Sequence, residues 1–575
     1  MAAGEHIDSY NGYSDKLKRS DFDELFSVAP MMGHTNRHYR YFYRLLSSKT
    51  HLYTEMIPGS QIWAAYRRAR DTYLPQTPKG SSSSSTSMEI PPSEEIMEVV
   101  SKVIRDPSLE YTAAAPFDNR MVTLHQLLAT SSLSSSSITR GSSEHPVVLQ
   151  LGGNNPAALS VASAIGMAWG LAESLEADQT RSPTYTSVNL NCGCPSNAVG
   201  GRAGGCALMA TPDLVARSVE SMKESIDSVW NNRKDRSPPV TIKHRLGIRE
   251  AATFDASEDR AKNDDEAFEE ASSFVRTVSL AGAVPKFHVH TRLGLLGDFC
   301  GEDEEENKSK QHTRQKLWVP GSNSGKEVII NSDDAAPRIK IDHKREQEKA
   351  RQLSRRATIK NRDVPPLRPN VVPRLAEAFP HLQFVANGGI DDLDHVKRVV
   401  EESLNSKRSG VIGAMVGRAV INHPCSFSAA DCELWGSKKT AITRGQVLEE
   451  YIQYCDTEEA LIESYGASPS QLESLRKRLV AVPFHLFTGE EGSDEFQRRL
   501  KKLKDTKMGG GRHNPKKKNK KNGIAMKAAS VLRAAASFVP SETLNKPVDD
   551  YVPWKDVAKF EGGLKRGSAL QRVVY

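Results

Sequence analysis

The chain has few cysteines and no long apolar runs, and each shortage excludes a class of protein. Seven cysteines among 575 residues form no disulfide framework, which favours a reducing compartment. Cys192 and Cys194 form a C-x-C pair, but no second pair at zinc-ligand spacing accompanies them, so we expect no metal. No apolar run approaches membrane-spanning length and the mean hydropathy is −0.51, so we expect no membrane partner.

Targeting signals and a dinucleotide fingerprint are also missing. The N-terminal segment has no apolar signal core and carries acids such as Glu5 and Asp8, whereas a transit peptide is poor in acids. We therefore expect a cytoplasmic protein, with the nucleus or an organelle left open. No G-x-G-x-x-G string occurs, which argues against a dinucleotide held by a Rossmann fold. The net charge of +7 is compatible with an anionic partner but does not require one.

Short β-branched or apolar runs recur along the chain, and helix-like segments follow many of them. An α/β fold, a (β/α)8 TIM barrel, is the architecture that this alternation predicts, with a doubly wound open sheet as the main rival. The runs are Phe26–Ala29, Leu52–Thr54, Val147–Leu151, Ser187–Leu190, Val240–Lys243, Phe287–His290, Gln383–Ala386 and Val411–Val416.

Composition divides the chain into three parts. We expect an N-terminal extension over 1–25, the barrel over 26–436, and a helical, basic domain with its tail over 437–575. Within the barrel, the serine-rich stretch at about 62–145 and the charged stretch at about 297–356 are predicted to be surface insertions, partly disordered.

The helical part carries two basic segments. One contains Arg498 and Arg499, and the other is the lysine run from Lys516 to Lys521. The lysine run is compatible with a solvated tail, a nuclear signal or a nucleic-acid contact, and the sequence does not decide among them.

The octet Asn-Leu-Asn-Cys-Gly-Cys-Pro-Ser, which spans Asn189–Ser196, places a thiol on a turn braced by glycine and proline. A cysteine on such a turn can give or take a proton above a bound ligand. A buried, inert cysteine is the alternative, and the octet alone does not choose between the two.

Polar residues end or follow nearly every predicted strand, where the chemistry of a barrel is found. Glycines after the last two strands would let backbone N–H groups approach a phosphate, and Arg418 would add a charged contact. Gln150 could bond the edge of a heteroaromatic ring, so the set predicts FMN. Taken singly, each residue also has a purely structural interpretation. The candidates are Pro30, Met31, Met32, Glu55, Gln150, Asn191, Cys194, Lys243, His290, Asn387, Gly388, Gly389, Gly417 and Arg418.

These strings, in this order, resemble the tRNA-dihydrouridine synthase family, most closely its A-type branch. The likeness covers about residues 26–430 outside the two insertions, and Phe487-Thr-Gly and Phe496–Arg499 resemble, more weakly, the family's RNA-binding domain. The matching strings are Phe26–Met32, Tyr53–Met56, Leu149–Gly153, Asn189–Ser196, Val240–Ile248, Val289–Arg292, Asn361–Arg362, Pro365–Arg368, Phe379–Leu382, Asn387–Ile390 and Val416–Ala419.

The resemblance implies an NADPH- and FMN-dependent enzyme that reduces the C5–C6 bond of a uridine in the tRNA D-loop, at position 20 or 20a. Cys194 would be the proton donor and Asn191 would lie beside the target base. Arg498 and Arg499 would contact the tRNA. The residues implied to line or hold FMN are Pro30, Met31, Met32, Gln150, Lys243, His290, Asn387, Gly388, Gly389, Gly417 and Arg418.

The sequence departs from the family pattern at a few positions. Gly33-His34 replaces an acidic and an aromatic residue, Cys192 replaces a valine, and Lys360 replaces an acidic residue. Two other functions stay open: an FMN barrel that reduces a free pyrimidine or other small molecule, and a non-catalytic RNA-binding barrel. The sequence gives neither the set of tRNAs, nor the role of the insertions, nor the oligomeric state.

Overall fold

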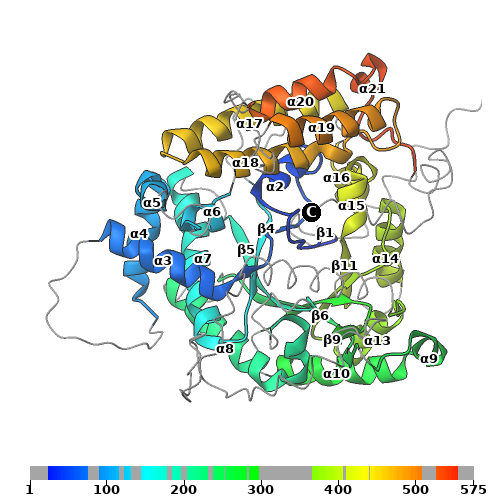
Figure 1. Cartoon of the computed structure of the whole chain (residues 1–575). Helices are drawn as coiled ribbons and strands as arrows, with labels where there is room; N and C mark the ends of the chain where they lie inside the picture. The colour runs from blue at the N-terminus through cyan, green and yellow to red at the C-terminus, as the bar shows by residue number, and fades with distance from the viewer. Residues whose placement is uncertain are drawn as a thin grey trace, which may run out of the picture.

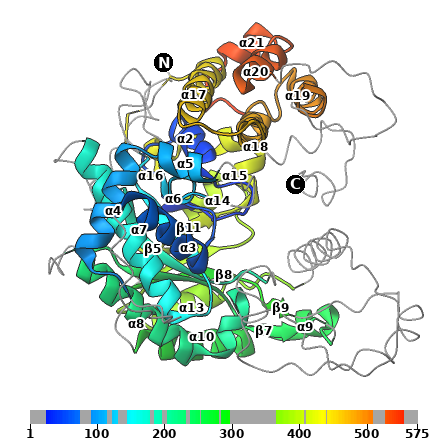
Figure 2. The ribbon, with the colours of Figure 1, turned by 60° about the vertical axis from the view of Figure 1, so that its left-hand side comes forward.

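The computed structural model consists of a ring of parallel strands enclosed by helices, with a further group of helices at one side (Figures 1 and 2). The structure describes residues 24–74, 90–114, 122–130, 144–177, 184–195, 204–230, 237–251, 253–280, 284–296, 365–405, 410–438, 441–507 and 526–553.

Eight parallel strands form the barrel, and all eight predicted runs are confirmed as strands. Their order around the sheet is β1-β11-β10-β8-β6-β5-β4-β2. The ring closes between its two ends, because the Val28 amide donates to the His51 carbonyl at 2.9 Å and the His51 amide to the Phe26 carbonyl at 3.1 Å. The strands are β1 (Phe26–Val28), β2 (Leu52–Tyr53), β4 (Val147–Gly152), β5 (Tyr185–Cys192), β6 (Val240–Arg245), β8 (Lys286–His290), β10 (Gln383–Asn387) and β11 (Val411–Val416).

Three short strands were not predicted. β3 (Ile57–Pro58) pairs with β4, and β7 (Ile248–Glu250) pairs with β9 (Gly294–Leu296) in a separate parallel sheet. This second sheet extends the ends of two neighbouring barrel strands beyond the ring.

Helices cover the outside of the ring, and a group of them follows the last strand. The described helices are α2 (Arg37–Arg44), α3 (Gly59–Tyr73), α4 (Ser93–Arg105), α5 (Ser108–Ala114), α6 (Leu124–Leu128), α7 (Pro156–Ala177), α8 (Pro212–Val229), α9 (Ala256–Ala261), α10 (Asp265–Ser279), α13 (Val371–Ala378), α14 (Leu393–Asn405), α15 (Arg418–Asn422), α16 (Ala430–Trp435), α17 (Arg444–Ser464), α18 (Pro469–Ala481), α19 (Ser493–Lys507), α20 (Ala528–Ala536) and α21 (Ser541–Asn545). Three 3₁₀ segments accompany them, η3 (Gly205–Ala210), η5 (Pro424–Phe427) and η6 (Val482–His485).

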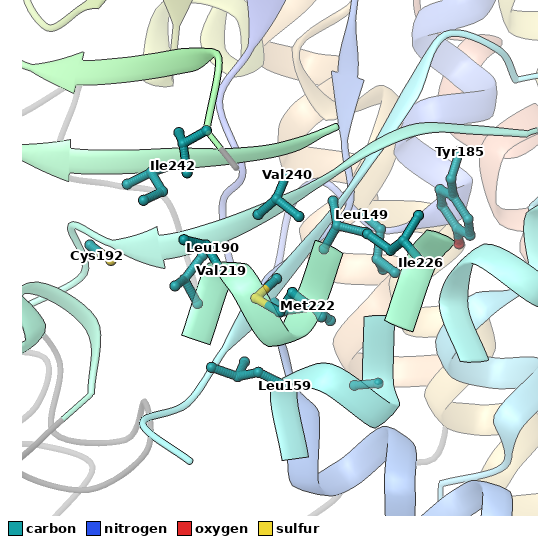
Figure 3. Packing of buried hydrophobic residues seen from close by; sticks show 14 of the residues in the cluster. Leu149, Leu159, Tyr185, Leu190, Cys192, Val219, Met222, Ile226, Val240 and Ile242 are labelled. Carbon is teal, nitrogen blue, oxygen red and sulfur yellow. The ribbon is translucent and has the colours of Figure 1, made fainter. Parts of the chain in front are cut away.

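The core between sheet and helices follows from strand alternation. On β5, Leu190 and Cys192 face the helices, where Figure 3 shows them with Val219 and Met222 of α8. Asn189 and Asn191, the alternate residues, face the barrel interior. Burial raises the pKa of the Cys192 thiol, so Cys192 stays a neutral, packed side chain.

The predicted insertion at about 62–145 requires a correction, because much of its described part is folded core. Most of α3 and all of α4 to α6 lie within it, and α4 buries Ile96, Val99 and Val103 in the cluster that also contains residues of α7. The apolar spacing i, i+3, i+7 on α4 explains this burial. The serine clusters at 81–85 and 131–137 and the insertion at 297–356 lie outside the described residues.

Helix α7 corrects the expectation that no apolar segment approaches membrane-spanning length. Pro156–Leu175 is long and apolar enough by length and composition, and 83% of the window is buried inside the protein. The helix is apolar on all sides because it packs between the sheet and helices α3, α4 and α8.

Beyond residue 441 the described chain is helical apart from one isolated bridge, and it packs on α2 (Figure 2). Helix α17 begins with a capping box between Thr443 and Gln446. Glu458 on this helix forms a largely buried ion pair with Arg37 of α2. Beside that pair, the His38 Nδ1 atom lies 2.8 Å from the Tyr454 hydroxyl. The helical part is therefore fixed to the barrel through charged and aromatic contacts.

Candidate active site

The turn that carries Cys194 is held from three directions at the end of β5. The backbone N–H groups of Gly193 and Cys194 donate to Asn191 Oδ1 at 3.0 and 2.9 Å. Arg245 Nε donates to the Gly193 carbonyl at 2.8 Å. The Cys206 amide donates to the Cys194 carbonyl at 2.8 Å, which ties the turn to η3. Cys194 itself is partly exposed, as a group that meets a ligand must be.

Gln150 lies in the interior row that runs from β4 to β6. Its Nε2 donates to Asn189 Oδ1 at 2.8 Å, and Asn189 Nδ2 donates to Thr241 Oγ1 at 2.8 Å. Asn191 Nδ2 donates to Gln150 Oε1 at 3.1 Å. Asn191 therefore bonds both to Gln150 and to the Cys194 turn, and its predicted place beside a target base stays a prediction.

Lys243 and Asn387 meet inside the barrel. Lys243 Nζ donates to Asn387 Oδ1 at 2.9 Å, and Asn387 Nδ2 donates to the Met415 carbonyl at 2.8 Å. Burial, together with the nearby positive charge of Arg245, lowers the pKa of Lys243 to about 7. Lys243 therefore gains or loses its charge within the physiological range.

His290 ends β8 among several cations. Its pKa lies well below the usual value, first because it is buried and then because Arg245, Lys243, Arg292 and Arg418 act on it. His290 is thus neutral at pH 7, and the same cations create a positive potential that favours an anionic ligand.

Gly388 and Gly389 form a tight turn directly after β10. Their φ angles are +117° and +74°, where side chains are rarely found. A Cβ atom on Gly388 would lie 2.8 Å from Thr291 Oγ1 and 3.0 Å from His290 Cδ2. Thr291 Oγ1 is buried and has no hydrogen-bond partner among the described residues. This hydroxyl therefore has hydrogen-bonding capacity that a ligand at the turn could use.

The first and last strands end side by side, because the Ala29 amide donates to the Val416 carbonyl at 2.8 Å. A Cβ atom on Gly417 would lie 3.9 Å from Met31 Sδ, so the loop after β1 borders the start of α15 at Arg418. In that loop Pro30 and Met31 are partly buried and Met32 is exposed. Glu55 accepts a hydrogen bond from the Gly33 amide in the same loop.

Arg498 and Arg499 lie apart from this cluster, on α19 of the helical part. Arg498 is 73% exposed and pairs with Glu495. Arg499 pairs with the same carboxylate and stacks 4.1 Å over the Phe538 ring. Ser196, Lys360, the string at 361–362 and the lysine run Lys516–Lys521 lie outside the described residues. Among the residues that the structure describes, no group of three or more His, Cys, Asp or Glu side chains could hold a metal ion.

Comparison with known proteins decides the family. The family model described as dihydrouridine synthase matches residues 27–82, 94–315 and 352–522. The chain belongs to the dihydrouridine synthase family. The match covers the turn with Cys194, the glycine pair after β10, and most of the helical part.

Curated members of the dihydrouridine synthase family are similar to this chain over most of their length. Three that are named tRNA-dihydrouridine(20/20a) synthase come from Synechocystis, Pseudomonas putida and Escherichia coli. They are 26%, 27% and 27% identical to it, over 82%, 78% and 75% of this chain and 87%, 82% and 76% of the relatives. A solved structure described as "Crystal structure of TcOYE with pHBA" aligns with a TM-score of 0.23 and 9% identity, over 71% of this chain and 88% of that one. The barrel follows from the strand order of the chain itself.

Several residues of this dihydrouridine synthase site were not singled out from the sequence. Asn189 and Thr241 join the interior row, Arg245 holds the Cys194 turn, and Thr291 lies against Gly388. Three of them have a simple signal in the sequence. Asn189 precedes Asn191 by two positions, and Thr241 and Arg245 lie two positions on either side of Lys243, so strand alternation places them on the same interior face.

Proposed function

We propose that this protein is a flavin-dependent tRNA-dihydrouridine synthase that reduces the C5–C6 bond of a uridine in the tRNA D-loop. The observation that carries the proposal is the Cys194 turn, which Asn191 and Arg245 fix at the mouth of a barrel lined with cations. Membership of the family supports the reaction, and the names of the relatives support position 20 or 20a as the target.

The residues at the mouth fit FMN as the cofactor. Its phosphate suits the region of the Gly388–Gly389 turn. Three kinds of group there would bind it: the backbone N–H groups of the turn, the unpaired Thr291 hydroxyl and the charge of Arg418. Gln150 suits the edge of its ring, since its carboxamide keeps one donor and one acceptor beyond its bonds to Asn189 and Asn191. The other residues proposed to line or hold the cofactor are Pro30, Met31, Met32, Lys243, His290, Asn387 and Gly417. A bound FMN would supply the hydride for C6 of the uracil ring, with NADPH as the source of the electrons.

The protein's own residues hold, orient and donate one proton. Cys194 holds a proton on Sγ and donates it to C5, where negative charge develops after hydride addition. Asn191 and Arg245 fix the turn, so that the thiol keeps one direction toward the base. Lys243, with a pKa of about 7, would take up a proton and become charged beside the anionic cofactor.

We further propose a role for the helical part in tRNA binding. A uridine must leave its stack to enter a barrel mouth, which costs a few kcal/mol. Contacts of Arg498, Arg499 and the lysine run with the phosphate backbone would offset this cost and would weaken as salt rises. The proposed division is a barrel at 26–436 and a helical domain at 437–575, in a protein that acts in the cytoplasm.

Mass spectrometry of tRNA nucleosides from cells that lack the gene tests the reaction. We expect dihydrouridine to disappear at one D-loop position. Undiminished dihydrouridine at every position would contradict the proposal. Equal activity of the purified protein on free uridine and on tRNA would favour a small-molecule reductase instead.

The role of Cys194 is tested with a matched cysteine control. We expect Cys194→Ala to keep its yellow flavin and its tRNA affinity but to lose most turnover, because the proton donor is gone. Cys432→Ala removes a partly exposed thiol on α16, away from the strand ends, and should keep full activity. Loss of flavin from Cys194→Ala would show that its role is misassigned.

A further inference from the structure

A buried chain of hydrogen bonds crosses β4, β5 and β6 beneath the Cys194 turn. Its members lie side by side because the strand register pairs Gln150 with Asn189 and Asn189 with Thr241. All three are essentially fully buried. The chain continues upward from Gln150 to Asn191, and from there to the turn.

The backbone N–H groups of the turn determine which atom donates and which accepts in each hydrogen bond of this chain. The backbone N–H groups of Gly193 and Cys194 can only donate, so the amide oxygen of Asn191 must face them. Its NH₂ group therefore faces Gln150 and donates to Oε1.

The same logic fixes the next two links. Gln150 must then present its own NH₂ group to Asn189, which accepts through Oδ1. Asn189 in turn donates to Thr241 Oγ1. Thr241 is the last acceptor, and its hydroxyl hydrogen points to the Val188 carbonyl at 3.5 Å. One orientation of each amide satisfies all these partners at once.

We propose that Asn189 and Thr241 are positioning residues for the reaction, which set the orientation of the Gln150 carboxamide and of the Cys194 turn together. The inference rests on the proposed function, because it takes Gln150 to contact the cofactor and Cys194 to supply the proton. Neither Asn189 nor Thr241 touches the reacting atoms. Both act through the amides that they hold.

The chain of hydrogen bonds stabilises one orientation of each amide group over its flipped orientation. A buried carboxamide that has lost one of its partners leaves a polar atom without a hydrogen bond, which is unfavourable, so an incomplete chain rearranges. A flipped Gln150 would exchange the donor and acceptor that it offers to a ligand. A flipped Asn191 would turn NH₂ toward two backbone N–H groups and release the turn.

Thr241→Val tests the chain at its last acceptor, because valine keeps the shape and removes the hydroxyl. Thr241→Ser keeps the hydroxyl and serves as the conservative variant. Ile242→Val, on the next residue of the same strand but facing the helices, controls for packing loss alone. Thermal melting of all three checks that each is folded.

Two measurements report on the chain of hydrogen bonds without requiring turnover. The first is the Kd for FMN, from titration of the apoprotein followed by flavin fluorescence. The second is the rate of Cys194 alkylation by iodoacetamide in the FMN-bound protein, followed by mass spectrometry of its peptide. For Thr241→Val we expect the Kd for FMN to rise about tenfold and the kcat on tRNA to fall about as much, with an altered alkylation rate. Thr241→Ser and Ile242→Val should match the wild type.

The outcomes separate this inference from the proposed function. If Thr241→Val matches Ile242→Val in FMN affinity and in Cys194 alkylation, the positioning role is wrong. If Thr241→Ser is as impaired as Thr241→Val, the effect is packing and the inference also fails. If the wild type makes no dihydrouridine, the proposed function fails, while FMN affinity and alkylation still decide on the chain.

Discussion

Arg245 donates from Nε to the carbonyl oxygen of Gly193 at 2.8 Å, one residue before Cys194. Its Nη1 donates to the Leu293 carbonyl at 2.7 Å, and the side chain is buried. One guanidinium thus joins the turn after β5 to the loop after β8.

Removal of this guanidinium should slow the proton transfer. We expect Arg245→Met to lower kcat on tRNA at least about tenfold, since one buried and one partly buried carbonyl lose their donor and the turn is released. Single-turnover oxidation of the reduced flavin by tRNA measures the step directly. The control is Arg249→Met on β7, which removes a more exposed arginine that pairs with Glu266. This variant should retain the rate. An unchanged rate in Arg245→Met would remove Arg245 from the account.

The turn after β10 predicts a specific loss of cofactor. Gly388→Ala adds a methyl group 2.8 Å from Thr291 Oγ1 at a φ of +117°, so we expect the purified protein to be colourless or nearly so. Flavin absorbance per mole of protein measures the effect. Gly436→Ala, at the end of α16, also places a side chain at a positive φ, +66°, but with open space around the added carbon. It should keep its flavin, and equal flavin loss in both variants would point to general destabilisation.

The lowered pKa of Lys243 predicts proton uptake when FMN binds. Above its pKa of about 7 the free amine is neutral, and a phosphate dianion nearby favours the charged form. At pH 8 we therefore expect binding to take up a proton, whereas at pH 6 Lys243 is already charged and adds none. Calorimetric titration of the apoprotein in buffers of different ionisation enthalpy measures the uptake. In Lys243→Met the difference between the two pH values should shrink, and an unchanged difference would assign the proton to another group.

Glu24 predicts acid sensitivity at the opposite end of the barrel. Burial alone would raise its pKa, but His288 and Lys286 outweigh burial and hold the pKa well below the usual value. Glu24 also accepts from the Tyr53 hydroxyl at 2.8 Å. Because the folded pKa is depressed, this stabilisation is present above the unfolded value of about 4.3 and is lost as pH falls through the folded value.

We accordingly expect Glu24→Gln to lower the free energy of unfolding by about 3 kcal/mol at pH 7. Its stability should also fall less steeply in acid than that of the wild type. Urea denaturation between pH 3 and 7 measures both quantities, with activity at 25 °C as the check that the mouth is intact. A wild-type acid limb retained in Glu24→Gln would show that other carboxylates control it.

The barrel was predictable because each strand has a strong local pattern. Val240 and Ile242 alternate with Thr241 and Lys243, so the sequence itself marks the buried outer face and the polar interior. β3, β7 and β9, of two or three residues each, are too short to show such a pattern. Helix α4 was missed for a different reason, since serine-rich flanks hid its apolar face within a stretch of low complexity.

The residue type of Cys194 indicates chemistry in the sequence itself, and the structure places this residue on the turn after β5. Strand alternation gives the interior-facing place of Arg245 but not its role, because that role depends on contact with Gly193 from a neighbouring strand, and strand order is a property of the fold. Asn191 shows the limit most clearly. Its place near Cys194 follows from the motif, but its use of both amide ends within the protein depends on the distances to Gln150 and to the turn.

Helices α19 and α20 pack against each other, and Arg444 binds the carbonyl of Pro547 at 2.6 Å and that of Asp550 at 2.8 Å. The chain between these two helices, which includes Lys516–Lys521, therefore starts and finishes on one folded unit. Its lysines lie on a connection whose two ends belong to the same folded unit. A cut within residues 508–525 would leave two fragments that stay together, whereas truncation at residue 507 would also remove Val531 and Leu532 from the core. Deletion within residues 508–525 alone is consequently the way to separate the contribution of the lysine charge from that of the fold.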